Sequence, residues 1–264
     1  MYAIANATII PLRQQPDEGS EQLTQLLWGE NCEVLERLPR WTRVRSLLDG
    51  QEGWGDFKMF TLSDKAPTTP IPTAVVCVPC AYCEDCLTGE RTLLTMGTRL
   101  PEYEEGTFLL LDRRYRIAPQ HVASSPLPFT PENILRLTQS LLNTPYLWGG
   151  KSALGIDCSG LTQVVYSVFG VNLLRNAREQ ITQGQPVNSL DQAQTGDLVF
   201  FDHADRDPQA TNISHVGLLL SPTEVVHCSG KVHVNNIDAH GIYLPSGERT
   251  HHLVGIRRYM PRFL

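Results

Sequence analysis

The fold is decided by the stretch Leu147-Trp-Gly-Gly-Lys-Ser-Ala-Leu-Gly-Ile-Asp-Cys-Ser-Gly160, which leads directly into a run with helical spacing. The apolar residues that follow recur every three or four positions: Leu161, Val164, Val165, Val168 and Phe169. Gly170 then supplies a typical stop signal. The pattern predicts an amphipathic helix with Cys158 at its N-terminus.

Cys158 is a candidate nucleophile because of this position. The positive end of the helix dipole and the unpaired backbone N–H groups favour a thiolate over a thiol. The alternative is a buried structural cysteine, which is the commonest fate of a free thiol. Asp157 and Ser159 are polar neighbours on either side, so we favour the nucleophile.

Two histidines are placed to serve such a nucleophile. The segments Ile213-Ser-His-Val-Gly-Leu-Leu-Leu220 and Glu224-Val-Val-His-Cys-Ser229 alternate and are rich in β-branched residues, which predicts two strands. His215 and His227 are each six residues from Ser221 (221 − 215 and 227 − 221). A hairpin centred on Ser221 sets them directly opposite one another, as general base and orienting group. We assign ordinary solvated or core roles to other histidines of this half: His203, His233, His240, His251 and His252.

A shorter helix is expected upstream. Thr130 can cap it and Pro131 suits its first position. Its apolar stripe consists of Ile134, Leu137, Leu141 and Leu142, and it should end near Asn143-Thr-Pro145. The Pro-rich stretch Ser124–Pro131 marks the junction before it.

The N-terminal half is β-rich, with short apolar runs separated by turn-forming residues. A first five-stranded barrel is predicted from Ala7–Leu12, Leu23–Trp28, Cys32–Leu38, Trp41–Leu47 and Gly53–Phe60. The Pro- and Thr-rich stretch Ser63–Pro72 is typical of a linker. A second, diverged barrel is predicted from Ala74–Cys77, Thr92–Leu94, Thr98–Leu100, Thr107–Leu111 and Tyr115–Ile117. We therefore expect an α+β protein with domains at 1–64, 65–124 and 125–264.

Seven cysteines, an odd number, exclude a full set of disulfides and favour reduced thiols. Four of them recur at every third residue, as in closely spaced zinc or iron–sulfur ligands: Cys77, Cys80, Cys83 and Cys86. Structural zinc sites usually use two separated knuckles, and ferredoxin-type runs take one ligand from elsewhere. We favour a cysteine-rich edge of the second β domain, with a metal site as the alternative.

Composition and charge exclude several classes of protein. The chain of 264 residues is 41% hydrophobic and 19% charged, which is typical of a globular protein. A net charge of −6 without a Lys/Arg cluster gives no footprint for nucleic acid or an anionic membrane. Polar residues interrupt the first fifteen positions, so no secretory signal is visible. We expect a cytoplasmic protein, or an extracytoplasmic one if a signal was removed.

Five motifs together resemble the NlpC/P60 family of papain-like peptidases, which act in bacterial cell-wall metabolism. They are Thr144-Pro-Tyr-Leu-Trp-Gly-Gly150, Asp157-Cys-Ser-Gly160, Gly196-Asp-Leu-Val-Phe-Phe201, His215-Val-Gly217 and Val226-His227. The resemblance covers roughly Pro128 to Leu264. It implies a papain-like catalytic domain with Cys158 as nucleophile, His215 as base, His227 as orienting residue and Tyr146 near the oxyanion. It implies neither a metal nor an organic cofactor.

The front half resembles the bacterial SH3-type modules fused to such peptidases, in Ser20–Glu30 and Gly50–Trp54. That resemblance implies that Asp157 binds the ammonium group of an N-terminal L-Ala, assisted by Glu21 and Trp54. Ser159, Arg175 and Asn176 are the further expected substrate contacts. Arg175-Asn-Ala177 departs from the family's Arg, then Asp or Thr, then Ser or Ala, which puts the contact of Asn176 in doubt.

The implied reaction is hydrolysis of the bond between γ-D-Glu and a diamino acid, diaminopimelate or Lys, through a thioester. The expected substrate is a murein tripeptide or tetrapeptide with a free L-Ala terminus, in wall-peptide recycling by a monomeric enzyme. The alternatives are a secreted hydrolase of intact wall, a non-catalytic SH3-type peptide-binding protein and, ranked last, an acyltransferase. The residues leave open the preferred diamino acid and the tolerance of longer stems.

Overall fold

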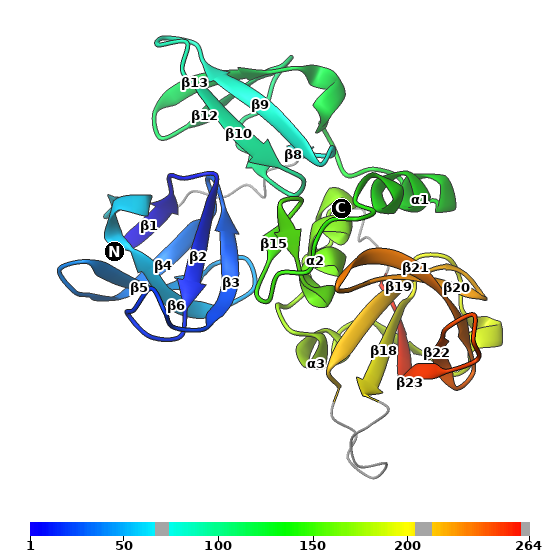
Figure 1. The fold of residues 1–264 in the computed structure, drawn as a ribbon. Coiled ribbons are helices and arrows are strands. Elements are labelled where there is room, and N and C mark those ends of the chain that lie inside the picture. Colours follow the sequence, from blue (N-terminus) through cyan, green and yellow to red (C-terminus); the bar gives the residue numbers. More distant parts are fainter. Residues whose placement is uncertain (67–73, 204–212, 260–264) are drawn as a thin grey trace. The chain divides into compact units, whose positions relative to one another are not determined.

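The computed structural model describes residues 1–66, 74–203 and 213–259, which form two compact units (Figure 1). The first unit contains Met1–Leu127 together with Trp148–Ala153, and the second contains Pro128–Leu147 and Leu154–Leu264. The predicted boundary at 124/125 lies close to the end of the first unit. The return of residues 148–153 to that unit is not indicated by the sequence pattern. Most of the predicted linker, from residue 67, lies outside the described residues.

The first 66 residues form one antiparallel sheet in the order β3-β2-β6-β5-β4-β1-β7. Its strands are β1 (Tyr2–Ala5), β2 (Ile9–Arg13), β3 (Gln22–Leu27), β4 (Asn31–Arg37), β5 (Trp41–Ser46), β6 (Glu52–Asp56) and β7 (Phe60–Ser63). Alternate side chains of β5 face the core, so Thr42, Val44 and Ser46 are buried. Val44 joins Ile10 and Leu26 in the core of this module.

The prediction of five strands in this module is wrong, because the sheet has seven. β1 was missed, and the predicted strand Gly53–Phe60 is interrupted. Asp56 accepts a hydrogen bond from Lys58 N, which opens the 3-10 turn Phe57–Met59 between β6 and β7. The Phe60 ring then packs against Gly55, where a Cβ would lie 2.7 Å from Phe60 Cε2.

Residues 74–123 form a four-stranded sheet, β10-β9-β13-β12, and a three-stranded sheet, β11-β8-β14. The strands are β8 (Ala74–Val76), β9 (Cys80–Asp85), β10 (Arg91–Thr95), β11 (Arg99–Leu100), β12 (Thr107–Leu110), β13 (Arg113–Ile117) and β14 (Val122–Ala123), with a 3-10 turn at Pro119–His121. Trp28 from the end of β3 packs edge-on against Tyr115 and Phe108 in the core of this second module. The two β modules therefore share one aromatic cluster inside the first unit. The returning residues 148–153 add the short strand β15 (Lys151–Ser152) to that unit.

The cysteine run lies on and beside β9, a strand that the sequence pattern did not predict. Residues three apart on a strand face opposite sides, so Cys83 is buried whereas Cys80 is exposed. Across residues 1–66, 74–203 and 213–259, no group of three or more His, Cys, Asp or Glu residues is arranged to hold a metal ion.

The second unit is built on a six-stranded antiparallel barrel that closes because β23 pairs with both β18 and β22 (Figure 1). The strands of this unit are β16 (Gly155–Ile156), β17 (Gln185–Val187), β18 (Leu198–His203), β19 (His215–Ser221), β20 (Glu224–Ser229), β21 (Lys231–Asp238), β22 (Gly241–Tyr243) and β23 (Arg249–Arg258), with a 3-10 turn at Leu190–Gln192. β17 extends the sheet beside β23. The barrel core consists of apolar residues such as Phe201, Leu219 and Val225.

The helices of this unit are α1 (Pro131–Ser140), α2 (Cys158–Val168) and α3 (Ala177–Gln180). The start of α1 is confirmed, since Thr130 Oγ1 accepts a hydrogen bond from Asn133 N at 3.4 Å. Ile134, Leu137 and Leu141 are buried, whereas Leu142 is 37% exposed and lies outside the apolar stripe. Within the described part of the chain, no helix is long and apolar enough to cross a membrane.

The prediction for α2 is confirmed from its first to its last turn. The predicted apolar face is buried, namely Leu161, Val164, Val165, Val168 and Phe169. Gly170 has a φ of +76°, which a glycine adopts at little cost. Its N–H donates to Ser167 O while Val171 N–H donates to Tyr166 O, the paired bonds of a Schellman motif. α2 packs on β19 and β20.

Candidate active site

Cys158 is the first residue of α2, and Asp157 is the N-cap residue before it. Asp157 Oδ1 accepts a hydrogen bond from Gly160 N–H at 2.7 Å, which fixes the start of the helix. Burial, followed by the charge of Asp157, raises the pKa of the Cys158 thiol to about 12, although the backbone of Val216 and that of Ser159 lower it. The predicted thiolate character of Cys158 stays a prediction, and the raised pKa favours transfer of the thiol proton to a base during attack.

His215 and His227 are brought together, but not in the predicted register. His215 Nε2 lies 2.8 Å from His227 Nδ1. Directly opposite His227 stands Gly217, because the turn consists of Pro222 and Thr223 and a bulge follows Leu219. The two histidines are thus diagonal neighbours on one face, not an opposed pair.

Gly217 leaves the space that this diagonal contact needs. A Cβ built on Gly217 would lie 2.5 Å from Val225 Cγ2 and 3.2 Å from His227 Cβ. Any larger residue would force Val225 on β20 to shift, since a 2.5 Å contact is closer than real side chains allow. The glycine of the motif His215-Val-Gly217 therefore has a steric role in assembling the histidine pair.

His227 is held as a neutral ring inside the barrel. Burial lowers the pKa of His227 to about 3, against the opposing effect of its hydrogen bond with Asn235. Its Nε2 lies 2.8 Å from Asn235 Oδ1. The His233 ring, directly across the strand pair, has its centroid 4.5 Å away. Asn235 was missed from the sequence, although strand alternation from His227 through its partner His233 could have indicated it.

His251 is a second residue that the sequence pattern did not place in the site. It is buried, and its ring centroid lies 4.6 Å from that of His215 in a tilted stack. Phe201 flanks both rings, with centroids 6.0 Å from His215 and 5.9 Å from His251. The His215 ring is therefore packed against two other rings, which restricts its rotation.

Asp157, Ser159 and Arg175 form one buried network next to the nucleophile. Arg175 Nη2 donates to Asp157 Oδ2 at 2.6 Å, and its Nη1 donates to Asp157 Oδ1 at 3.1 Å and to Ser159 Oγ at 2.8 Å. Arg175 is only 1% exposed. These three residues were predicted as substrate contacts, and here they fix one another in place. Their contact with substrate stays a prediction.

Tyr146 and Asn176 occupy the two flanks of the catalytic segment in sequence. Burial raises the pKa of the half-buried Tyr146 phenol, and the next causes are the charges of Cys158 and Asp157. The phenol therefore stays protonated and can donate a hydrogen bond, as a residue near the oxyanion must.

Asn176 caps α3. The Glu179 carboxylate accepts hydrogen bonds from the Asn176 backbone N–H at 3.0 Å and from Asn176 Nδ2 at 2.8 Å.

Glu21 and Trp54 belong to the first unit. Glu21 Oε1 accepts a hydrogen bond from Trp148 Nε1 at 2.8 Å, so this carboxylate helps to hold the returning segment. Trp54 lies on β6 and is buried. Their predicted part in recognising the substrate amine stays a prediction.

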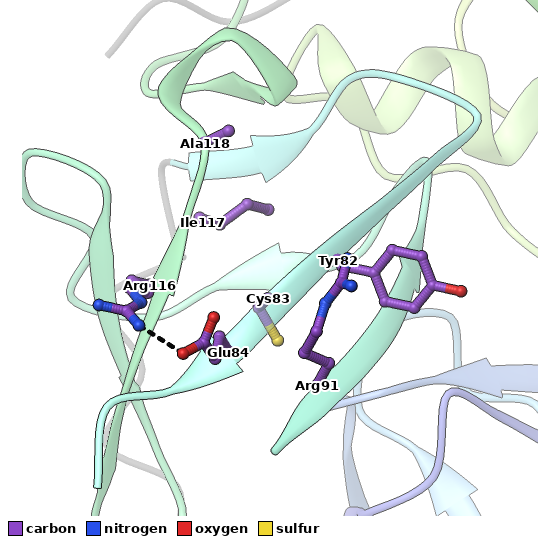
Figure 2. A pocket seen from close by; sticks show the side chains of 7 residues that line it. All are labelled: Tyr82, Cys83, Glu84, Arg91, Arg116, Ile117 and Ala118. Atoms are coloured by element: carbon purple, nitrogen blue, oxygen red, sulfur yellow. Dashed lines mark hydrogen bonds and ion pairs between the residues drawn. The ribbon is translucent and has the colours of Figure 1, made fainter. Parts of the chain in front are cut away.

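A surface hollow of about 450 Å³ lies in the second β module, and none of the predicted catalytic residues lines it (Figure 2). Arg116 pairs with Glu84 there, and the Arg91 guanidinium lies 4.3 Å from the Tyr82 ring centroid. Its charged groups are thus already partnered within the module.

Comparison with known proteins identifies the families that the chain is similar to. The NlpC/P60 family matches residues 143–252, and the bacterial dipeptidyl-peptidase SH3 domain family matches residues 12–54. The chain is 30% identical to the gamma-D-glutamyl-L-lysine dipeptidyl-peptidase of Bacillus subtilis (strain 168) over 217 residues, which cover 77% of this chain and 71% of that protein. It is 42% identical to dipeptidyl-peptidase 6 of Lysinibacillus sphaericus over 118 residues, 42% of this chain and 39% of that protein.

A solved structure shows the same fold over nearly the whole chain. It is the crystal structure of an NlpC/P60 family protein from Bacillus cereus ATCC 10987, with a TM-score of 0.84 at 20% identity. The superposition covers 99% of this chain and 100% of that one.

Proposed function

Because the chain belongs to the NlpC/P60 family, we propose that it is a cysteine peptidase acting on peptides of the bacterial cell wall. The observation that carries the proposal is the buried thiol of Cys158 at the start of α2, in the same unit as a His215 ring hydrogen-bonded to a neutral His227. A thiol nucleophile needs a general base, and that base needs a third group that orients it, as His227 orients His215 here.

The reaction proceeds through a thioester. His215 takes the thiol proton at the ring nitrogen that does not contact His227, and Sγ forms a bond to the peptide carbonyl carbon. The tetrahedral oxyanion collapses, the C–N bond breaks, and the imidazolium gives its proton to the departing amine. Water, deprotonated by the same ring, then attacks the thioester and releases the acid and the thiol. Tyr146 donates a hydrogen bond to the oxyanion in both steps.

The bond cleaved joins γ-D-Glu to a diamino acid, in a murein tripeptide or tetrapeptide with a free L-Ala terminus. The name of the Bacillus subtilis relative, a gamma-D-glutamyl-L-lysine dipeptidyl-peptidase, supports this bond. Asp157 binds the ammonium group, which replaces or shares one of the four hydrogen bonds that the carboxylate accepts from Gly160, Ser159 and Arg175. Ser159, Arg175 and Asn176 shape the same subsite, and Glu21 and Trp54 assist from the first module.

Mass spectrometry of products tests this proposal. Wild type and Cys158→Ala are incubated with L-Ala-γ-D-Glu-meso-diaminopimelate, with its Lys counterpart and with the same peptides acetylated at the amino terminus. Release of L-Ala-D-Glu from the free peptides by wild type alone supports the assignment. Turnover by Cys158→Ala would remove the proposed nucleophile, and equal cleavage of acetylated peptides would remove amine recognition.

We further propose a monomeric enzyme of cytoplasmic wall-peptide recycling. A requirement for a free amino terminus in the peptide experiment would support this role, because intact wall has its L-Ala blocked. Cell fractionation and light scattering check the location and the oligomeric state. Efficient solubilisation of purified sacculi would instead favour a hydrolase of intact wall.

A further inference from the structure

A diagonal row of polar side chains crosses three neighbouring strands of the barrel. His215 lies on β19, His227 on β20 and Asn235 on β21. His227 is paired with His233 across the β20–β21 ladder, and Asn235 follows two residues later, on the same face. Successive members of the row are 2.8 Å apart, from His215 Nε2 to His227 Nδ1 and from His227 Nε2 to Asn235 Oδ1.

The donors and acceptors along this row can be assigned from Asn235 outward. An amide oxygen only accepts, so His227 must carry its proton on Nε2. A neutral imidazole has one N–H, which leaves Nδ1 of His227 as an acceptor. That acceptor takes the proton of His215 Nε2, and His215 Nδ1 is left with the lone pair that must receive the thiol proton.

We propose that Asn235 is a positioning residue that, through His227, holds His215 in the tautomer able to deprotonate Cys158. This inference rests on the proposed peptidase function. The opposite orientation of the amide reverses every bond in the row: Nδ2 donates to His227 Nε2, His227 Nδ1–H donates to His215 Nε2, and the proton of His215 then sits on Nδ1. A base protonated at that position cannot accept a second proton from the nucleophile.

The assignment of donors and acceptors requires an uncharged His227, and the surroundings of this ring disfavour its protonated form. The ring is buried, and the titratable groups that face it are His215 from β19, His233 from β21 and His251 from β23. Burial is the main cause of its lowered pKa, with smaller contributions of the same sign from His233 and His251.

Three variants test the proposal. Asn235→Leu removes the acceptor at similar volume, Asn235→Asp keeps an acceptor, and Asn236→Leu is the matched control on the neighbouring exposed residue of β21. We expect Asn235→Leu to lower kcat by roughly 10²-fold with little change in KM, a smaller loss than the ~10⁴-fold that a wrong histidine tautomer costs a serine peptidase. Asn236→Leu should leave both parameters unchanged. Asn235→Asp should retain most of the activity at neutral pH and lose it as the new carboxylate is protonated.

A readout independent of turnover separates this inference from the function itself. Nitrogen-15 NMR of histidine-labelled protein should show His227 protonated on Nε2 in wild type and in Asn235→Asp, and a mixture of tautomers in Asn235→Leu. Wild-type kcat together with an unchanged tautomer in Asn235→Leu would overturn the inference. If wild type cleaves none of the peptides, the function fails while the NMR result still decides the role of Asn235. If Asn235→Leu does not fold, the pH–activity profile of Asn235→Asp decides it, and a profile identical to wild type rejects the inference.

Discussion

Lys151 forms a buried ion pair with Glu30, 121 residues earlier in the chain. Its ammonium group donates to both carboxylate oxygens, at 2.9 and 3.0 Å, and its own backbone N–H donates to Gln25 Oε1 at 2.9 Å. Gln22 Nε2 also donates to Trp148 O at 2.8 Å. These contacts fix the segment Trp148–Ala153 within the first unit, a few residues before the nucleophile.

Replacing Lys151 by Met should destabilise the first unit by about 3–5 kcal/mol, because it removes the ion-pair partner of a buried carboxylate. Burial already raises the pKa of Glu30 in spite of the attraction of Lys151, which shows how costly this environment is for charge. The double variant Lys151→Met/Glu30→Leu should recover most of the loss. Urea unfolding of the three proteins measures this, and equal stability of Lys151→Met and wild type would contradict it.

Alkylation of Cys158 should be slow at neutral pH and should rise about tenfold per pH unit towards pH 11, because the thiolate reacts and the pKa of the thiol is about 12. Peptide mapping after timed exposure to iodoacetamide follows the reaction, with the exposed Cys80 as an internal reference. A rate that is already constant at pH 6 would show a preformed thiolate–imidazolium pair instead.

Gly217→Ala should break the contact between His215 and His227 and lower kcat by roughly 10²-fold, with a loss of about 1–3 kcal/mol in stability from overpacking. The matched control is Gly255→Ala on β23, where a Cβ meets only Ile181 Cδ1 at 3.2 Å. Kinetics on the free peptide and thermal melts compare the two. An active, stable Gly217→Ala protein would show that the diagonal contact does not need this glycine.

Stability should fall as the pH drops from about 6.5 towards 3, because the pKa of His227 is about 3 in the folded protein against an ordinary value of 6.5. The unfolded state binds the proton first in this window, so the neutral ring stabilises the fold above pH 6.5 and that contribution is lost on acidification. The full shift corresponds to about 4–5 kcal/mol. The slope of unfolding free energy against pH should be shallower in His227→Asn, and identical slopes would count against the buried neutral ring.

Arg175→Met should be more destabilising than Arg175→Lys, because Met removes the charge opposite Asp157 whereas Lys loses only the two-point geometry. We expect a loss of about 3–5 kcal/mol for Met, comparable to other broken buried pairs. Thermal unfolding gives the order of the two variants. If both match wild type, the network of Asp157, Ser159 and Arg175 does not support the start of α2.

The sequence predicted the catalytic helix because its information is local. The start at Cys158, the apolar face and the stop at Gly170 all lie within thirteen residues of chain. The contact between His215 and His227 was predicted, but their strand register was not. The register depends on which two residues form the turn and on a bulge, and neither leaves a clear sequence pattern. Asn235 and His251 were missed because strand pairing across the barrel brings them to the site.

Two features of the first unit were not predicted. The strand β9 was not among the predicted strands, although a cysteine-rich edge of this β domain was expected. The buried ion pair of Lys151 with Glu30 was not predicted either. A charge that finds its partner 121 residues away gives no local signal.

The assignment of Trp148–Ala153 to the first unit makes the peptidase unit discontinuous in the chain. A truncated protein that begins at Pro128 would carry this short segment, including the Lys151 ammonium group. It would lack the carboxylate and amide groups of the first unit that accept its hydrogen bonds. We therefore expect such a truncation to be insoluble or aggregation-prone, although the cut falls in a Pro-rich junction that looks like a natural place to divide the protein. A chimera that exchanges the SH3-type module must therefore also exchange the segment Trp148–Ala153.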